Sequence, residues 1–229
     1  MARDQLQQEA AMKIGIIGAG HIGGNLARRL TAAGHDVSIA NSRGPDTLRD
    51  VASKTGARPV QAADAARDKD LVIVTIPEKG VTELPKDLFA STDRHTVVVD
   101  TGNYYPKRDG KIETIEDGET ESRWVSDQLG RPVVKAFNTI YAHNIVDRAR
   151  PKGDGTRLAL PVAGDDANAK KVVMQVIDDI GFDSVDAGGL DDSWRQQPGT
   201  PVYGAELDAS GVQRALADAK QERPKEFRA

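Results

Sequence analysis

The chain has 229 residues, no cysteine and a formal net charge of −4, and 38% of its residues are hydrophobic and 4% aromatic. The lack of cysteine excludes disulfides, thiol nucleophiles and thiolate metal sites, and we expect no metal site. The acidic balance and scarce aromatic residues disfavour a nucleic-acid partner. No apolar stretch approaches the ~18 residues that span a membrane. We therefore expect a cytoplasmic protein, with residues 1–11 as a flexible leader because they lack the apolar core of a signal peptide.

A short apolar run at residues 13–17 leads directly into a Gly-x-Gly-x-x-Gly motif, and a helical pattern of apolar residues follows at 22–33. Strand, glycine turn and helix in this order are typical of a dinucleotide-binding βαβ unit. Gly18 permits the tight turn, Gly20 has no Cβ to obstruct a pyrophosphate, and Gly23 lets the helix pack closely on the strand. We expect the phosphates at the N-terminus of this helix, where unpaired N–H groups favour an anion.

The end of the second predicted strand indicates which dinucleotide binds. An NAD site usually carries an Asp or Glu there for the ribose 2′-hydroxyl, whereas this chain has Asn41, Ser42 and Arg43. Amide, hydroxyl and guanidinium groups all donate hydrogen bonds to a 2′-phosphate. Asp36 starts the strand and therefore lies at the wrong end to bind the ribose. The sequence predicts NADP(H), with a solvated turn at residues 41–45 as the alternative.

Strand and helix patterns alternate through the rest of the chain as far as residue 186. We expect helices at 46–55, 61–68 and 166–180, and strands at 58–60, 71–75, 96–100, 132–137, 158–162 and 182–186. This alternation predicts an α/β fold, a Rossmann doubly wound parallel sheet with a small C-terminal α/β extension. We assign residues 12–150 to an NADP-binding Rossmann domain. Residues 151–219 form an extension that completes the cleft, by lengthening the sheet or as a small second lobe, and residues 220–229 a charged, mobile tail.

Ligands of open α/β sheets bind beyond the carboxyl ends of the strands, so the loops there are candidate sites. Ile76 and Pro77 follow the fourth strand and suit a wall under an adenine or nicotinamide ring, or they start the next helix. Asn103 follows the fifth strand, and Asn138 and Thr139 follow the sixth. These three side chains are candidates for ligand contact or for capping of the segments that follow.

The sequence offers no clear apparatus for proton transfer. Of the four histidines only His143 is expected near this rim, and none of Tyr104, Tyr141 and Tyr203 is followed four residues later by a lysine. A short-chain dehydrogenase that reduces carbonyls is therefore disfavoured. Hydride transfer to a flavin-like ring needs no strong protein acid, because the two cofactors carry the chemistry and the protein orients them. We accordingly assign no catalytic residue.

Five segments resemble the coenzyme F-420-dependent NADP oxidoreductases, bacterial members included. They are residues 14–29, 40–45, 74–77, 100–104 and 133–139, and the resemblance extends over roughly residues 12–219. It implies that NADP(H) and an 8-hydroxy-5-deazaflavin, coenzyme F-420, meet in the cleft and exchange a hydride. The reductase domains of six-transmembrane ferric reductases share the pattern, which adds flavin as an acceptor.

The resemblance also implies a set of contacts with the dinucleotide. The implied residues are Gly18, Gly20, His21 and Ile22 at the pyrophosphate, Ser42 and Arg43 at the 2′-phosphate, Ile76 and Pro77 along the dinucleotide, and Ala136, Phe137, Asn138 and Thr139 near the nicotinamide.

Two departures from the family pattern bear on the acceptor. The first turn is shorter than the Gly-Gly-Thr-Gly form of archaeal enzymes, and the polar segment 188–203 is longer. Residues 194–197 either contact the second substrate or belong to a packed connection. Three functions stay open: a reductase of a small-molecule flavin or deazaflavin acceptor, an imine or carbonyl reductase of the pyrroline-5-carboxylate reductase type, and a non-catalytic NADPH-binding sensor. A homodimer is compatible with the sequence.

Overall fold

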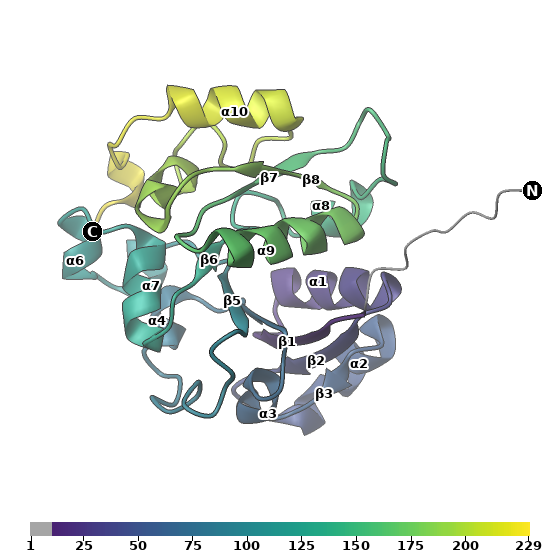
Figure 1. Cartoon of the computed structure of the whole chain (residues 1–229). Coiled ribbons are helices and arrows are strands. Elements are labelled where there is room, and N and C mark those ends of the chain that lie inside the picture. Colours follow the sequence, from purple (N-terminus) through teal and green to yellow (C-terminus); the bar gives the residue numbers. More distant parts are fainter. Residues whose placement is uncertain (1–10) are drawn as a thin grey trace, which may run out of the picture.

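The computed structural model describes residues 11–229, so residues 1–10 of the expected leader lie outside the described part. Six parallel strands form one sheet in the order β3-β2-β1-β4-β5-β6 (Figure 1). The strands are β1 (Lys13–Ile17), β2 (Asp36–Ala40), β3 (Arg58–Pro59), β4 (Leu71–Val74), β5 (Val97–Asp100) and β6 (Val134–Lys135). This order is that of a Rossmann sheet, and it confirms the predicted fold class. Strand β6 is shorter than the expected 132–137.

The helices of the first part of the chain lie in the connections between these strands, except the last of them, which follows β6. They are α1 (His21–Ala32), η1 (Pro45–Leu48), α2 (Arg49–Thr55), α3 (Ala62–Ala66), α4 (Glu78–Val81), α5 (Pro106–Asp109), α6 (Glu113–Glu116), α7 (Glu121–Leu129) and α8 (Asn144–Asp147). The helix expected at 46–55 is divided, because its first turn after Pro45 is a 3₁₀ turn, η1. Helix α1 buries the predicted apolar stripe that includes Leu26 and Leu30.

Both faces of the sheet are covered, which explains the continuous apolar character of its strands. On β4, Leu71 and Ile73 point into one hydrophobic cluster and Val72 and Val74 into another. The first cluster contains residues of α1 and α2, and the second contains residues of α3. Ligands of such sheets bind at the carboxyl ends of the strands, which here include the ends of β1, β4 and β5.

The C-terminal part forms a small second layer. It comprises β7 (Ala159–Val162), α9 (Ala167–Asp179), β8 (Asp183–Asp186), η2 (Leu190–Gln196), α10 (Ala209–Asp218) and η3 (Lys225–Phe227). Strands β7 and β8 form a separate two-stranded parallel sheet, and directly after β7 an antiparallel bridge joins Ala163 to Lys135 of β6. Figure 1 shows α9 between this pair and the large sheet, and α10 on the outer side. Of the two arrangements expected, the structure has the second lobe.

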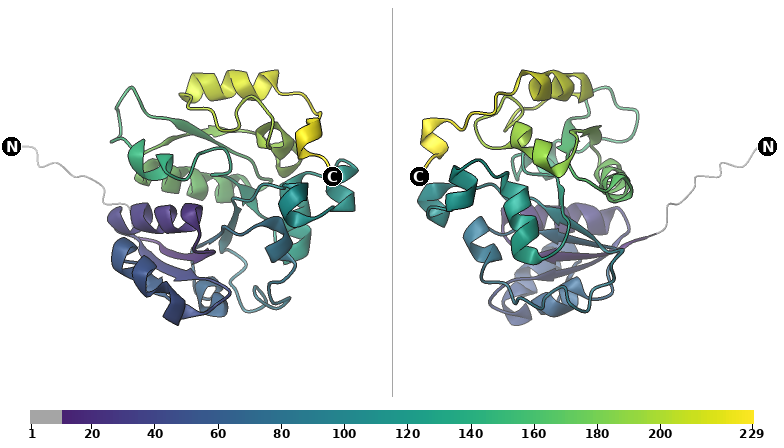
Figure 2. Two further views of the ribbon diagram at one scale, coloured as in Figure 1. Left: turned by 180° about the vertical axis from the view of Figure 1, so that it is seen from behind. Right: turned by 60° about the vertical axis from the view of Figure 1, so that its left-hand side comes forward.

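The charged tail, expected to be mobile, lies against the rest of the chain in this structure. Arg223 Nη2 is 2.9 Å from Glu121 Oε1, and the ring of Phe227 lies 6.0 Å from that of Tyr105. Figure 2 shows the C-terminus next to α6 and α7. Charge composition alone did not indicate this, because the partner of Arg223 is buried and distant in sequence. Among residues 11–229, no helix is long and apolar enough to cross a membrane.

Candidate functional site

The glycine turn between β1 and α1 has the geometry that the motif predicts. Gly18 has a φ of +116°, and a Cβ there would lie 2.5 Å from the carbonyl oxygen of Thr75. A Cβ on Gly23 would lie 2.0 Å from the carbonyl oxygen of Gly18. In contrast, a Cβ on Gly20 would meet no atom within 4 Å. Gly18 and Gly23 are thus required by the fold, whereas the bare backbone of Gly20 leaves free space for a ligand.

The N-terminus of α1 is open to an anion. Gly20 is the N-cap and offers no side chain, and the first turn of the helix contains no acidic residue. The N–H groups of this first turn, which includes His21 and Ile22, therefore point toward the space above Gly20. His21 is exposed and Ile22 half-buried. Backbone donors and the helix dipole together favour a phosphate at this position.

A cavity of about 650 Å³ opens beside this turn, at the carboxyl ends of β1, β2 and β4. It brings together seven of the predicted residues: Gly18, Gly20, Asn41, Ser42, Arg43, Ile76 and Pro77. Pro77 is also the N-cap of α4, so starting this helix is compatible with lining the cavity. The sequence interpretation missed Lys79 and Gln61, which line the same cavity. Lys79 lies two residues beyond Pro77 at the same strand end, and this position was the available signal.

The three polar residues after β2 divide into one that holds the turn and two that are free. Asn41 Oδ1 accepts a hydrogen bond from the Arg43 backbone at 3.0 Å, and Asn41 Nδ2 donates to Thr47 Oγ1 at 2.9 Å. Ser42 and Arg43 are exposed, and within residues 11–229 the Arg43 guanidinium has no hydrogen bond or ion pair. These hydrogen bonds make Asn41 part of the turn itself. The guanidinium of Arg43 is available to an anion.

The predicted residues after β6 lie apart from this cavity and are buried. Ala136 and Phe137 are at most 1% exposed, and Asn138 and Thr139 are 4% exposed. Phe137 has a φ of +64°, a conformation that costs a residue with a Cβ roughly 1–3 kcal/mol. It turns the chain sharply at the end of β6. In this structure neither Ala136 nor Phe137 presents appreciable surface to a ligand.

Asn138 links three segments instead of capping a helix. Its Nδ2 donates to Asn103 Oδ1 at 3.0 Å and to the carbonyl of Gln196 at 2.6 Å, and its Oδ1 accepts from Gln196 Nε2 at 2.9 Å. Asn103 Nδ2 in turn donates to the Asn138 carbonyl at 3.0 Å. The N-caps of the next helices are Tyr105 and His143, so the capping role considered for these asparagines is wrong.

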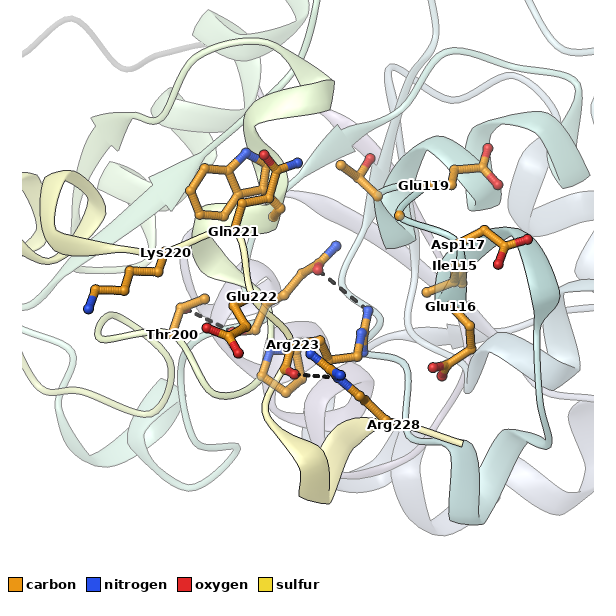
Figure 3. A pocket seen from close by; sticks show the side chains of 15 residues that line it. Ile115, Glu116, Asp117, Glu119, Thr200, Lys220, Gln221, Glu222, Arg223 and Arg228 are labelled. Atoms are coloured by element: carbon orange, nitrogen blue, oxygen red, sulfur yellow. Dashed lines mark hydrogen bonds between the residues drawn. The ribbon is translucent and has the colours of Figure 1, made fainter.

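Gln196 is completely buried, and this favours the packed connection for its part of the polar segment. The neighbouring Trp194 and Gln197 line a second cavity of about 540 Å³ between α6, η2 and the tail. Figure 3 shows acidic residues of the α6–α7 loop on one side of it and Arg223 and Arg228 of the tail on the other. This cavity contains none of the predicted coenzyme-binding residues.

A group of buried charges under the ends of β4, β5 and β6 was missed by the sequence interpretation. Lys135 is fully buried, and its Nζ lies 3.0 Å from Asp100 Oδ2 and donates to the Gly102 carbonyl at 2.6 Å. Burial alone would lower the pKa of Lys135, but Asp100 and two glutamates outweigh it and raise that pKa. Ser122 Oγ donates to the same Asp100 oxygen at 2.6 Å. Only tertiary proximity joins these residues, so no local pattern could have revealed them.

Histidine contributes no buried proton donor at this rim. His143 is exposed at the start of α8, and its ring stacks on that of Tyr141 with centroids 5.9 Å apart. Tyr105 and Tyr203 are hydrogen bonded through their hydroxyl groups. Burial and the neighbouring Tyr203 raise the pKa of Tyr105, so it is a neutral phenol at physiological pH. In the described part of the chain, no group of three or more acidic or histidine side chains is arranged to hold a metal ion.

One family model and several solved structures match this chain. Residues 13–104, which contain the glycine turn, Arg43 and Pro77, match the family model described as NADP oxidoreductase, coenzyme F420-dependent. A crystal structure of the hypothetical protein SMa0349 from Sinorhizobium meliloti is 33% identical, with a TM-score of 0.72, and the match covers 88% of this chain and 97% of that one. Residues 13–104 thus form a region that matches the F420-dependent NADP oxidoreductase family.

Two other similarities are more limited. Escherichia coli (strain K12) protein YjhV is 45% identical over 78 residues, which are 34% of this chain and 57% of that protein. The chain thus matches little more than half of this curated relative. A structure from Arthrobacter sp. FB24, titled a "putative f420 dependent nadp-reductase", is 23% identical with a TM-score of 0.60, covering 78% of this chain and 86% of that one. At this identity the match supports the fold.

Proposed function

We propose that the protein binds NADP(H) and transfers a hydride between its nicotinamide and a flavin or deazaflavin acceptor. The observation that carries the coenzyme assignment is the end of β2, where exposed Ser42 and unpaired Arg43 line the cavity in place of an acidic residue. A carboxylate at this position would repel a 2′-phosphate, whereas a guanidinium binds it with charge assistance. Lys79 adds a second positive charge to the lining of the same cavity.

The dinucleotide crosses the open edge of the sheet in this proposal. The adenosine end occupies the cavity between Arg43 and Pro77, and the pyrophosphate lies above Gly20 at the N-terminus of α1. The nicotinamide then continues over the carboxyl ends of β5 and β6, as in other doubly wound sheets. There the Asn103–Asn138–Gln196 network fixes the two strand ends and the η2 segment relative to each other. It is suited to hold a ring in a constant orientation.

The residues at the ends of β5 and β6 support a flavin or deazaflavin acceptor, which can accept a hydride without a strong protein acid. Hydride transfer between two stacked rings depends on their distance and orientation, because the chemistry belongs to the cofactors. The exposed His143 is poorly placed to act as a buried general acid. The name of the matching family supports a deazaflavin of the F420 type, and a flavin has the same planar tricyclic system.

The test is a panel of acceptors mixed with the purified protein and NADPH. FMN, FAD, riboflavin and an 8-hydroxy-5-deazaflavin are compared while nicotinamide absorbance is followed, with NADH as the matched donor control. We expect oxidation of NADPH with at least one tricyclic acceptor and much less with NADH. Oxidation that required a cyclic imine or a carbonyl compound would contradict the proposed acceptor. Tight NADPH binding without turnover on any acceptor would favour the sensor alternative.

A further inference from the structure

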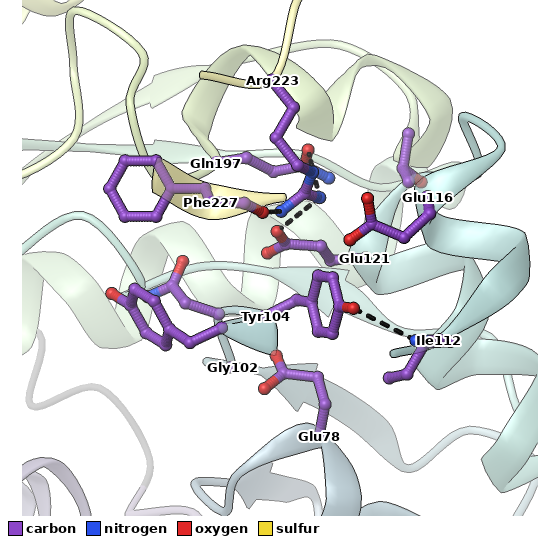
Figure 4. A network of polar contacts seen from close by, with 12 residues as sticks. Glu78, Gly102, Tyr104, Ile112, Glu116, Glu121, Gln197, Arg223 and Phe227 are labelled. Atoms are coloured by element: carbon purple, nitrogen blue, oxygen red, sulfur yellow. Dashed lines mark hydrogen bonds and ion pairs between the residues drawn. The ribbon is translucent and has the colours of Figure 1, made fainter. Parts of the chain in front are cut away.

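Two carboxyl groups that the proposed hydride transfer does not use are completely buried near the coenzyme edge. Glu78, the first residue of α4, and Glu121, the first residue of α7, are both 0% exposed. Each has one oxygen, Glu78 Oε1 and Glu121 Oε2, without a hydrogen-bond partner in the described part of the chain. Figure 4 shows the two carboxyl groups on either side of Tyr104. A buried ionised carboxylate with an unpaired oxygen is unfavourable, and protonation relieves the cost.

The charges that act on this pair come from α5, β5, β6 and the tail, and Glu116 of α6 lies on the other side of Tyr104 in the same network (Figure 4). Arg108 of α5 is 2.7 Å from Glu78 Oε2 and 2.8 Å from Asp109, and Arg223 of the tail is 2.9 Å from Glu121 Oε1. Lys135 of β6 and Asp100 of β5 form the remaining ion pair. Four carboxyl groups thus share three cations. One carboxyl group in the set lacks a cation of its own.

Burial makes protonation favourable at both carboxyl groups of the pair. Burial raises the pKa of Glu78 well above its usual value, and the charges of Glu121 and Asp100 raise it further. Burial also raises the pKa of Glu121, although Lys135 and Arg223 oppose the increase. Since the two groups repel each other as anions, they titrate as a pair.

The pair lies directly behind the edge over which the nicotinamide is proposed to pass. Pro77, which lines the coenzyme cavity, is the residue before Glu78. Glu78 Oε1 also packs under Gly102, beyond the end of β5, so closely that a Cβ on Gly102 would approach it to 2.5 Å. A positive charge on a ring over the carboxyl end of β5 therefore acts on these buried carboxyl groups more strongly than it would through water.

We propose that Glu78 and Glu121 together hold one proton when the reduced coenzyme is bound, and release it to solvent when the nicotinamide ring is oxidised and positively charged. The proposal rests on the proposed function. In this binding equilibrium, the protonated protein and NADP⁺ give the protein–NADP⁺ complex and one free proton. Glu78 and Glu121 are positioning residues here, since their negative charge stabilises the cationic ring without contact. The consequence is that the affinity of the protein for NADP⁺, relative to its affinity for NADPH, depends on pH.

Linkage gives the direction of this effect. Release of one proton makes NADP⁺ affinity rise with pH by up to tenfold per unit until the pH exceeds the pKa of the free pair, and then level off. NADPH carries no ring charge, so its affinity lacks this term. Both coenzymes have the same 2′-phosphate, and its own titration cancels in the ratio of the two dissociation constants.

The test is titration calorimetry of NADP⁺ and of NADPH with the full-length protein, in buffers of different ionisation enthalpy, over about pH 6 to 9. We expect wild-type protein to release more protons with NADP⁺ than with NADPH, by up to one per site. Glu78→Gln should abolish this difference. Glu121→Gln is the second variant, in case Glu78→Gln does not fold. Glu113→Gln removes an exposed carboxylate from the neighbouring α6 and should retain the difference.

The outcomes separate this proposal from the proposed function. If neither coenzyme binds, the proposed function fails. If both bind to the wild type and release equal numbers of protons at every pH, the function stands and the proton-holding pair is wrong. An unequal release that persists unchanged in both folded glutamine variants would also overturn it, because another group would then carry the proton.

Discussion

The carboxyl edge of the sheet has two halves, the ends of β1, β2 and β4 and the ends of β5 and β6, and they differ in how their charged groups are paired. At the ends of β1, β2 and β4, Arg43 and the N-terminus of α1 are exposed to solvent and lack protein partners in the described residues. At the ends of β5 and β6, Lys135 and Asp100 are buried and paired with each other. Unpaired donors facing an open cavity are suited to bind a ligand anion, whereas paired buried charges fix the backbone. Substitutions in the first half should therefore change binding, and those in the second half stability.

The largest effect is expected from Lys135→Met. It leaves Asp100, which is 2% exposed, without a cation, and removal of one partner of a buried pair typically costs about 3–5 kcal/mol. Urea unfolding of the free protein measures this cost. The matched substitution in the open half, Arg43→Ala, should change stability by less than about 0.5 kcal/mol. Equal losses in the free energy of unfolding of the two variants would contradict the distinction between the two halves of the edge.

The glycine turn allows the same comparison within one loop. Gly23→Ala places a Cβ 2.0 Å from the Gly18 carbonyl oxygen and should destabilise the fold by about 1–3 kcal/mol. Gly20→Val meets no protein atom with its Cβ, so the thermal transition should be retained. It obstructs the proposed pyrophosphate position, and we expect NADPH to bind at least tenfold more weakly, about 1.4 kcal/mol. Full NADPH affinity in Gly20→Val would contradict the assignment of this turn to the pyrophosphate.

The smallest effect is expected at the exposed His143. If hydride passes directly between stacked rings, His143→Ala should lower turnover by much less than the 10²–10⁴-fold typical of a lost general acid or base. Single-turnover oxidation of NADPH by the acceptor found in the panel measures it. A collapse of the rate with unchanged coenzyme affinity would instead indicate acid-assisted reduction of an imine or carbonyl.

The contrast between the two halves of the edge also explains which parts of the site could be predicted from the sequence. The glycine turn, the end of β2 and Pro77 are local features with positions fixed by a strand or helix end, and the structure brings them into one cavity. The expected strand 132–137 ends before Phe137, which adopts a positive φ that its residue type does not indicate. Glu78, Glu121 and Lys135 lie far apart in the chain and read as ordinary surface charges. Their burial depends on which helices and tail residues cover them.

The most direct test of the coenzyme site is the affinity of wild-type protein and Arg43→Ala for NADPH and NADH, measured side by side at one ionic strength. Loss of a charge-assisted bond to the 2′-phosphate should weaken NADPH binding by roughly 1.5–3 kcal/mol, about 10- to 150-fold, and leave NADH affinity almost unchanged. Wild-type protein should also prefer NADPH. Equal wild-type affinity for the two coenzymes, or an equal loss of both in Arg43→Ala, would contradict the assignment of Arg43 to the 2′-phosphate.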